Sequence, residues 1–108
     1  MGNPMLLNVF NRRDINRGVE EWQNTKGTVL LDVRTRGEYA DYHIQGSINI
    51  PLDELKAVRG SIPDKAMPIF VYCLSGGRSA STVALLKKSG YSHVYNIDGI
   101  NAYRGEIT

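Results

Sequence analysis

Hydrophobic positions along the chain form short apolar runs that alternate with stretches of helical periodicity. The runs 28–33 and 69–72 have strand length and almost no polar interruption, which is typical of strands covered on both faces of a sheet. Between residues 12 and 23, Ile15, Val19 and Trp22 recur at spacings of four and three, which predicts an amphipathic helix. Residues 77–88 show a similar pattern, with Ala80, Val83 and Ala84 on one face.

Shorter elements fill the intervals between these segments. Thr35 with Glu38 three residues later has the spacing of a capping box, and Asp53 is expected to cap another helical turn. The further predicted elements are strands at 8–10, 47–50 and 93–97, helical turns at 35–39 and 53–58, and a helical tail from residue 100. This alternation predicts an α/β fold with a central, mostly parallel sheet of about five strands and helices on both faces.

Composition narrows the class of protein. A chain of 108 residues with 42% hydrophobic and 22% charged residues is typical of one globular domain, here taken as residues 1–108. A net charge of +2, with no basic cluster longer than a pair, argues against a nucleic-acid partner. No apolar window approaches the roughly 18 residues of a membrane span, and the start does not resemble a secretory signal. We therefore expect a cytoplasmic protein without a membrane partner.

The candidate chemistry lies in the stretch 71–81, which contains the only cysteine of the chain. Cys73 lies at the end of a predicted buried strand, and Arg78 lies at the start of the predicted helix after that strand. Both residues are therefore expected at the edge of the sheet where ligands bind. Between them, Leu74 to Gly77 can bend so that backbone N–H groups point inward and form an anion-binding nest. A helix N-terminus and a nearby cation lower the pKa of a thiol. This pattern predicts a thiolate nucleophile rather than a cysteine that only packs.

Two further observations limit that chemistry. A single cysteine cannot form an internal disulfide, which suits a reducing compartment, so any sulfur chemistry must be completed by another molecule. Two histidines, fifty residues apart, and one cysteine do not have the spacing of a metal site. We expect neither a metal nor a cofactor.

Several ordered motifs resemble the rhodanese homology domain, and the likeness extends from about residue 8 to 105. They are Leu31-Asp32-Val33-Arg34, Glu38-Tyr39, His43-Ile44, Gly46-Ser47-Ile48-Asn49-Ile50-Pro51 and Val71-Tyr72-Cys73-Leu74-Ser75-Gly76-Gly77-Arg78-Ser79. One position departs from the pattern: many relatives carry a tryptophan where this chain has Tyr103, which affects local packing more than chemistry.

The resemblance implies a sulfurtransferase that moves sulfane sulfur from a donor such as thiosulfate to a thiophilic acceptor such as cyanide or a thiol. It assigns Cys73 as the nucleophile that carries the persulfide, and Arg78 as a cation for the loop or the anionic donor. The substrate-binding residues are expected to be Leu74, Ser75, Gly76, Gly77, Arg78 and Ser79, whose backbone N–H groups would surround the outer sulfur. The partners implied are a small anionic sulfur donor and an external thiol or thiol-bearing protein.

Four other motif residues resemble a catalytic set but have simpler interpretations. We expect Asp32 to brace the fold, Glu38 to act as a first-turn acid or partner of an arginine, and His43 to be satisfied in a loop. An ionised thiol needs no base to attack sulfur. Arg34 is left open between a structural role and added positive potential for an anionic donor.

Two other functions compete with sulfur transfer. Tyrosine phosphatases and arsenate reductases also surround an anion with a cysteine and an arginine, but they place five residues between the two, whereas four intervene here. Many rhodanese-like domains lack the cysteine and serve as non-catalytic interaction or regulatory modules, whereas this chain retains it.

Overall fold

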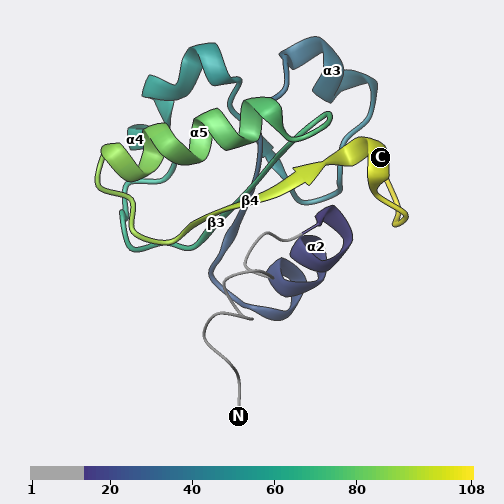
Figure 1. The fold of residues 1–108 in the computed structure, drawn as a ribbon, viewed down its shortest axis with the longest axis horizontal. Coiled ribbons are helices and arrows are strands. Elements are labelled where there is room, and N and C mark those ends of the chain that lie inside the picture. The colour runs from purple at the N-terminus through teal and green to yellow at the C-terminus, as the bar shows by residue number, and fades with distance from the viewer. Residues whose placement is uncertain (1–13) are drawn as a thin grey trace.

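A computed structural model describes residues 14–108 and shows a parallel sheet with helices on both faces (Figure 1). The sheet has four strands in the order β2-β1-β3-β4, and every neighbouring pair is parallel. The strands are β1 (Val29–Asp32), β2 (Ile48–Asn49), β3 (Ile69–Cys73) and β4 (Val94–Gly99). The helices are α2 (Ile15–Asn24), α3 (Arg36–Asp41), α4 (Val58–Ser61) and α5 (Gly77–Lys88), with 3₁₀ turns η1 (Leu52–Ala57) and η2 (Ile100–Ala102).

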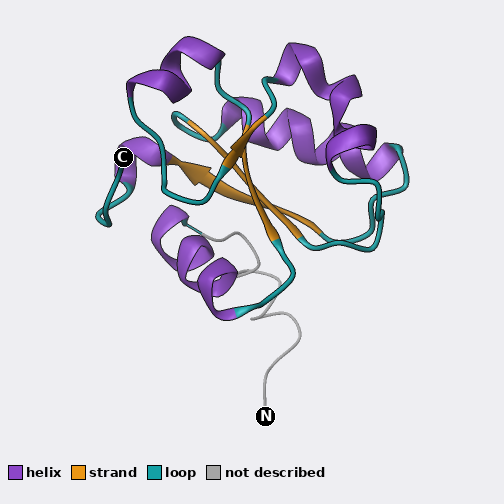
Figure 2. Ribbon diagram, turned by 180° about the vertical axis from the view of Figure 1, so that it is seen from behind, coloured by secondary structure: helices purple, strands orange, loops and turns teal. Residues whose placement is uncertain are grey.

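The two central strands are buried on both faces, which explains their continuous apolar sequence. Neighbouring residues point to opposite faces, so Leu31 and Val71 join one core cluster while Leu30 and Phe70 join the other. The first cluster packs under α4 and α5, and the second under α2 and η2. Figure 2, seen from behind, shows α2 on one side of the sheet and α4 and α5 on the other.

Most of the predicted elements are confirmed within one to three residues. Helix α5 has the predicted bounds, and the Thr35 side chain and Glu38 form both hydrogen bonds of a capping box at the start of α3. The sheet has four strands in residues 14–108 rather than about five, and the strand expected at 8–10 lies outside the described residues. None of the helices in the described part of the chain is long and apolar enough to cross a membrane.

Two predictions about local structure are wrong. Pro51 precedes the turn η1 and provides no side-chain cap, while Asp53 lies inside the turn instead of before it. The expected helical tail ends after the single turn η2, because the chain then extends and Ile107 forms an antiparallel bridge with Ile44. Pairing with another segment therefore outweighs local helix propensity in this tail.

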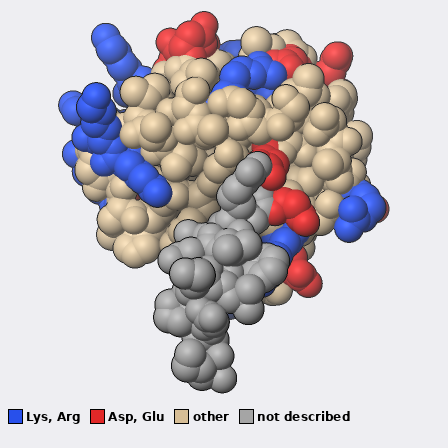
Figure 3. Space-filling model, viewed as in Figure 1, with Lys and Arg blue, Asp and Glu red and all other residues tan. Residues whose placement is uncertain are grey.

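Charged side chains cover the surface unevenly. Figure 3 shows Lys and Arg gathered toward the part of this face where α5 ends. Lys87 and Lys88 lie in the last turn of α5, where cations interact favourably with the helix dipole. This basic region lies at the opposite end of α5 from the loop that follows β3.

Candidate active site

Cys73 is the last residue of β3, and the loop after it leads directly into α5. Its residue is 1% exposed, at the carboxyl edge of the parallel sheet. The turn requires Gly76, which has a φ of +112° and precedes the first residue of α5. In this conformation the Gly76 N–H donates a hydrogen bond to Cys73 Sγ over 3.0 Å.

The surroundings of the sulfur favour its thiolate form. Burial alone would raise the pKa of Cys73, but hydrogen bonds from the Ser79 hydroxyl and from the N–H groups of Ser79, Gly76 and Ser75 outweigh it. The pKa of the thiol therefore lies below its ordinary value. The Ser79 Oγ lies 3.4 Å from Cys73 Sγ. Among the expected loop residues, Ser75, Gly76 and Ser79 thus act on the sulfur directly.

Leu74 and Gly77 complete the loop in different ways. Leu74 is 38% exposed, and its carbonyl oxygen accepts a hydrogen bond from the Asn101 N–H over 3.1 Å. A Cβ atom at Gly77 would meet nothing within 4 Å, so the space around this position does not require glycine.

The Arg78 guanidinium is bound by a carboxylate. Arg78 Nη1 donates to Glu38 Oε1 over 2.7 Å, and Nη2 donates to Oε2 over 3.0 Å. This fork, together with the N–H of Thr35, holds the pKa of Glu38 at about 2, compared with its ordinary 4.5. Both side chains are about one third exposed. The cation expected for an anionic donor is therefore present, but it is already paired.

Arg34 is buried in a second ion pair, with an exposed fraction of 1%. Its Nε and Nη2 donate to the Asp32 carboxylate over 2.8 to 3.1 Å, and Nη2 also donates to the Tyr42 carbonyl over 2.7 Å. Asp32 also accepts from the Arg34 backbone N–H. These contacts join the end of β1 to the end of α3 and favour the structural interpretation of Arg34 over the donor-binding one.

The end of β4 contributes residues that the sequence analysis did not single out. Asn96 Oδ1 accepts from Ser79 Oγ over 2.7 Å and from the Asp98 N–H over 2.8 Å, which fixes β4 against the cysteine loop. A Cβ at Gly99 would lie 2.1 Å from the Leu74 carbonyl oxygen, so only glycine allows this approach. A glycine at the end of a strand is a known signal of close backbone approach and could have identified this contact.

The other motif residues have structural contacts. Glu38 takes part in the capping box of α3 and forms an ion pair with Arg78. Both of its expected roles, first-turn acid and partner of an arginine, are therefore present. His43 Nδ1 lies 2.7 Å from the Tyr39 carbonyl oxygen, and the two rings stack at 3.7 Å. Tyr103 packs against the core cluster beneath α2.

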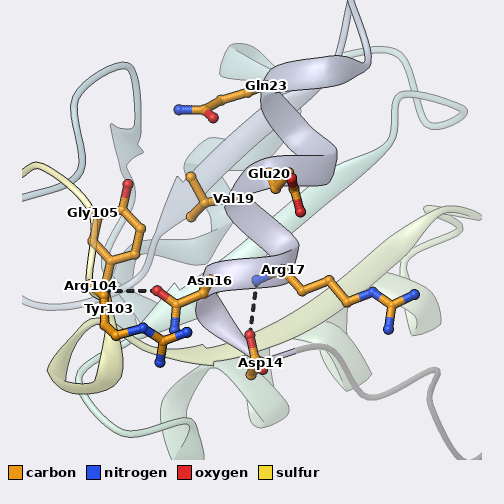
Figure 4. Close-up of a pocket in the computed structure, with 9 residues that line it drawn as sticks. All are labelled: Asp14, Asn16, Arg17, Val19, Glu20, Gln23, Tyr103, Arg104 and Gly105. Atoms are coloured by element: carbon orange, nitrogen blue, oxygen red, sulfur yellow. Dashed lines mark hydrogen bonds between the residues drawn. The ribbon is translucent and has the colours of Figure 1, made fainter.

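Three grooves in the part of the chain that the structure describes have no Cys73 in their lining. The one in Figure 4, about 580 Å³, lies between α2 and the C-terminal segment, where Asn16 accepts from the Arg104 N–H over 2.8 Å. No group of three or more potential metal ligands occurs among the residues that the structure describes. The candidate chemistry therefore rests on the loop after β3.

A lone buried cysteine, whose sulfur accepts a backbone N–H hydrogen bond at the carboxyl edge of a parallel sheet, defines the class of α/β domain to compare with known families. The family model described as Rhodanese-like domain matches residues 13–105. The chain belongs to the rhodanese-like domain family.

Individual relatives agree with this assignment. The chain is 41% identical over 71 residues to Thiosulfate sulfurtransferase PspE of Escherichia coli (strain K12), covering 65% of this chain and 68% of PspE. It is 36% identical over 75 residues to Thiosulfate sulfurtransferase GlpE of Pseudomonas fluorescens (strain Pf0-1), covering 68% of this chain and 67% of GlpE. These names support a sulfurtransferase function.

Solved structures show the same fold. A structure described as rhodanese with anions from E. coli superposes with a TM-score of 0.70 at 35% identity, covering 75% of this chain and 96% of that chain. Four other relatives are longer proteins, of which this chain spans only 14% to 36%.

Proposed function

We propose that the protein transfers sulfane sulfur from a small anionic donor such as thiosulfate to a thiol or cyanide, through a persulfide on Cys73. The observation that carries this proposal is the buried Cys73 sulfur, whose pKa is lowered by the Ser79 hydroxyl and by loop N–H groups. Two of the relatives are named thiosulfate sulfurtransferases. We place the acceptor, a free thiol or a thiol-bearing protein, in the cytoplasm, because the one cysteine suits a reducing compartment.

The first half-reaction begins with the Cys73 thiolate. Its lone pair attacks the outer sulfur of thiosulfate, a new S–S bond forms, and the old S–S bond breaks with its electron pair leaving on sulfite. The enzyme keeps a persulfide anion, so charge and atoms balance without any proton transfer. The loop N–H groups that stabilise the thiolate also suit the negative outer sulfur of the persulfide.

The second half-reaction returns the enzyme to its starting state. A thiolate or cyanide attacks the outer sulfur, and the electron pair of the breaking S–S bond returns to Cys73. The products are an acceptor persulfide or thiocyanate. Because the donor product leaves before the acceptor reacts, the proposal predicts ping-pong kinetics.

The test is intact-mass spectrometry after treatment with thiosulfate. We expect an adduct with the mass of one sulfur atom, lost again on adding cyanide, together with release of sulfite. Because Cys73 is the only cysteine of the sequence, a single sulfur adduct is assigned to Cys73. The control is Cys73→Ser, which should form no adduct. An unmodified wild-type protein, or equal sulfite release from Cys73→Ser, would contradict the proposal.

The two alternatives have less support. Phosphate-ester chemistry would need Arg78 to bind the phosphate, whereas Glu38 occupies both outer nitrogens of its guanidinium. A purely non-catalytic interaction module would not need a cysteine with a lowered pKa. The same mass experiment distinguishes the interaction module, because it would form no adduct.

A further inference from the structure

Both arginines considered for the anionic donor are paired with carboxylates. Arg34 binds Asp32, and Arg78 binds Glu38 through two hydrogen bonds. Arg78 also interacts electrostatically with the Cys73 sulfur, so its charge acts on the reacting atom. The net side-chain charge of these four groups is zero. The backbone N–H of Gly76 and the start of α5 add positive potential at the sulfur that neither carboxylate neutralises.

We propose that Glu38 is a specificity-determining residue that neutralises Arg78 and so favours sulfur donors with one negative charge over the thiosulfate dianion. The preferred donor class is an organic persulfide or thiosulfonate. This inference rests on the proposed sulfur transfer and names the donor class for the same site.

The position of Glu38 is built into the fold. Its Oε1 accepts from the Thr35 N–H over 2.9 Å as part of the capping box of α3, so the carboxylate is held in place from its own helix. It then meets Arg78, forty positions along the chain, in a two-pronged contact. A donor that used the Arg78 fork would have to displace this carboxylate. A dianion loses more than a monoanion when the cation is neutralised, because Coulomb energy is proportional to charge.

The chemistry of the preferred donors balances in the same way as that of thiosulfate. The Cys73 thiolate attacks the terminal sulfur of an organic persulfide, the donor S–S bond breaks, and a thiolate leaves with the electron pair. With a thiosulfonate, the leaving group is a sulfinate. In both cases the reacting group of the donor and the leaving group carry one negative charge. Such a monoanion loses less attraction than a dianion when Glu38 neutralises Arg78.

The experiment compares wild type with Glu38→Gln for two donors, thiosulfate and benzenethiosulfonate. Glutamine fits the capping-box position and retains an oxygen for the Thr35 N–H, but removes the charge. We expect the ratio of kcat/KM for thiosulfate to kcat/KM for benzenethiosulfonate to rise about tenfold, the lower end for one charge-assisted contact. Any change in the thiolate fraction affects both donors equally and cancels in the ratio.

Two control variants sharpen the comparison. Glu54→Gln removes the same charge from an exposed pair with Arg36, and the ratio should not change. Arg78→Gln leaves the Glu38 carboxylate without its cation, and the ratio should fall below that of wild type. The opposite signs of the two changes at one ion pair distinguish charge selection from general damage to the loop.

A second readout does not depend on sulfur transfer. The rate of Cys73 alkylation by iodoacetate, an anion, divided by that for iodoacetamide, which is neutral, should also rise in Glu38→Gln. If wild type transfers sulfur from no donor, the proposed function fails while this ratio still tests the role of Glu38. An unchanged alkylation ratio together with an unchanged donor ratio in folded Glu38→Gln overturns the inference.

Discussion

The Ser79 hydroxyl has one proton to donate, and three acceptors, including the reactive sulfur, lie near its oxygen. Its oxygen lies 2.7 Å from Asn96 Oδ1, 3.0 Å from the Gly76 carbonyl and 3.4 Å from Cys73 Sγ. The shortest contact indicates that the proton points to Asn96 while the sulfur is neutral, and it can turn toward the sulfur once a thiolate forms. The backbone N–H groups, by contrast, stay directed at the sulfur in both states.

Replacing Ser79 with alanine tests this contribution. Loss of the hydroxyl should raise the pKa of Cys73, so the rise of alkylation rate with pH should move to higher pH. At neutral pH we expect the iodoacetamide rate to fall about three- to tenfold, as for a weak hydrogen bond to a charged group. Ser81→Ala, on the exposed side of α5, is the matched control and should keep the wild-type profile. Superimposable profiles for the two variants would mean that the hydroxyl serves only Asn96.

Sequence could predict the groups that act on the sulfur locally, but not those that come from elsewhere in the fold. Cys73, Gly76 and Ser79 lie within seven positions, and the glycine-rich turn before a helix already implies inward N–H groups. The partner of Arg78 lies forty positions away. The sequence analysis expects Glu38 to act as a first-turn acid or as the partner of an arginine, and only the placement of α3 beside α5 shows that Arg78 is that partner.

At the scale of elements, the cysteine loop depends on how closely β4 approaches it. Gly99 has ordinary extended angles, with φ of −133° and ψ of 143°, so its backbone conformation does not require glycine. Its surroundings do, because a Cβ would lie 2.1 Å from the Leu74 carbonyl oxygen and 2.5 Å from Ser75 Cα. Both atoms belong to the backbone of the loop and can move only with the whole loop.

Gly99→Ala should therefore displace the loop and reduce both stability and sulfur transfer. We expect a loss of about 1–3 kcal/mol in the free energy of unfolding, as for other overpacked sites. Sulfite release should fall further than this instability explains, since the N–H groups around the sulfur shift. Gly77→Ala, which meets nothing within 4 Å, should retain activity and stability. Urea unfolding and the transfer assay on both variants measure these effects, and an active Gly99→Ala would refute the close-approach argument.

The success of sequence analysis also differs between elements. Strand β3 follows from continuous apolar residues and the bounds of α5 from the glycines before it, both of which are local signals. The expected apolar face of α5 is wrong, because Ala80 and Ala84 are exposed while Ser79, Thr82 and Leu86 are buried. The C-terminal tail does not follow from local signals, because its extended form depends on the backbone pairing of Ile107 with Ile44. In that segment the hydrogen bonds between residues 43 and 108 replace those of a helix.

At the scale of the whole molecule, a buried ion pair connects the sheet to the helices at the active edge. Asp32, fully buried at the end of β1, holds Arg34, which in turn binds the Tyr42 carbonyl after α3. Asn49 of β2 donates to the carbonyls of both Asp32 and Arg34 over 3.0 Å. The sequence analysis leaves the role of Arg34 open, because the burial that distinguishes a structural ion pair from a donor-binding cation depends on the complete fold.

This pair predicts a large difference between two arginines that lie two positions apart. Arg34→Met leaves the Asp32 carboxylate buried without its cation and should cost about 3–5 kcal/mol of the free energy of unfolding. Arg36→Met removes an exposed pair with Glu54 and should cost less than about 1 kcal/mol. Urea unfolding measures both as shifts of the midpoint at constant slope. Adding Asp32→Asn to Arg34→Met should restore part of the loss, because the unpaired charge is gone. If Arg34 instead binds the donor, Arg34→Met would raise KM for thiosulfate while the unfolding midpoint stayed at its wild-type value.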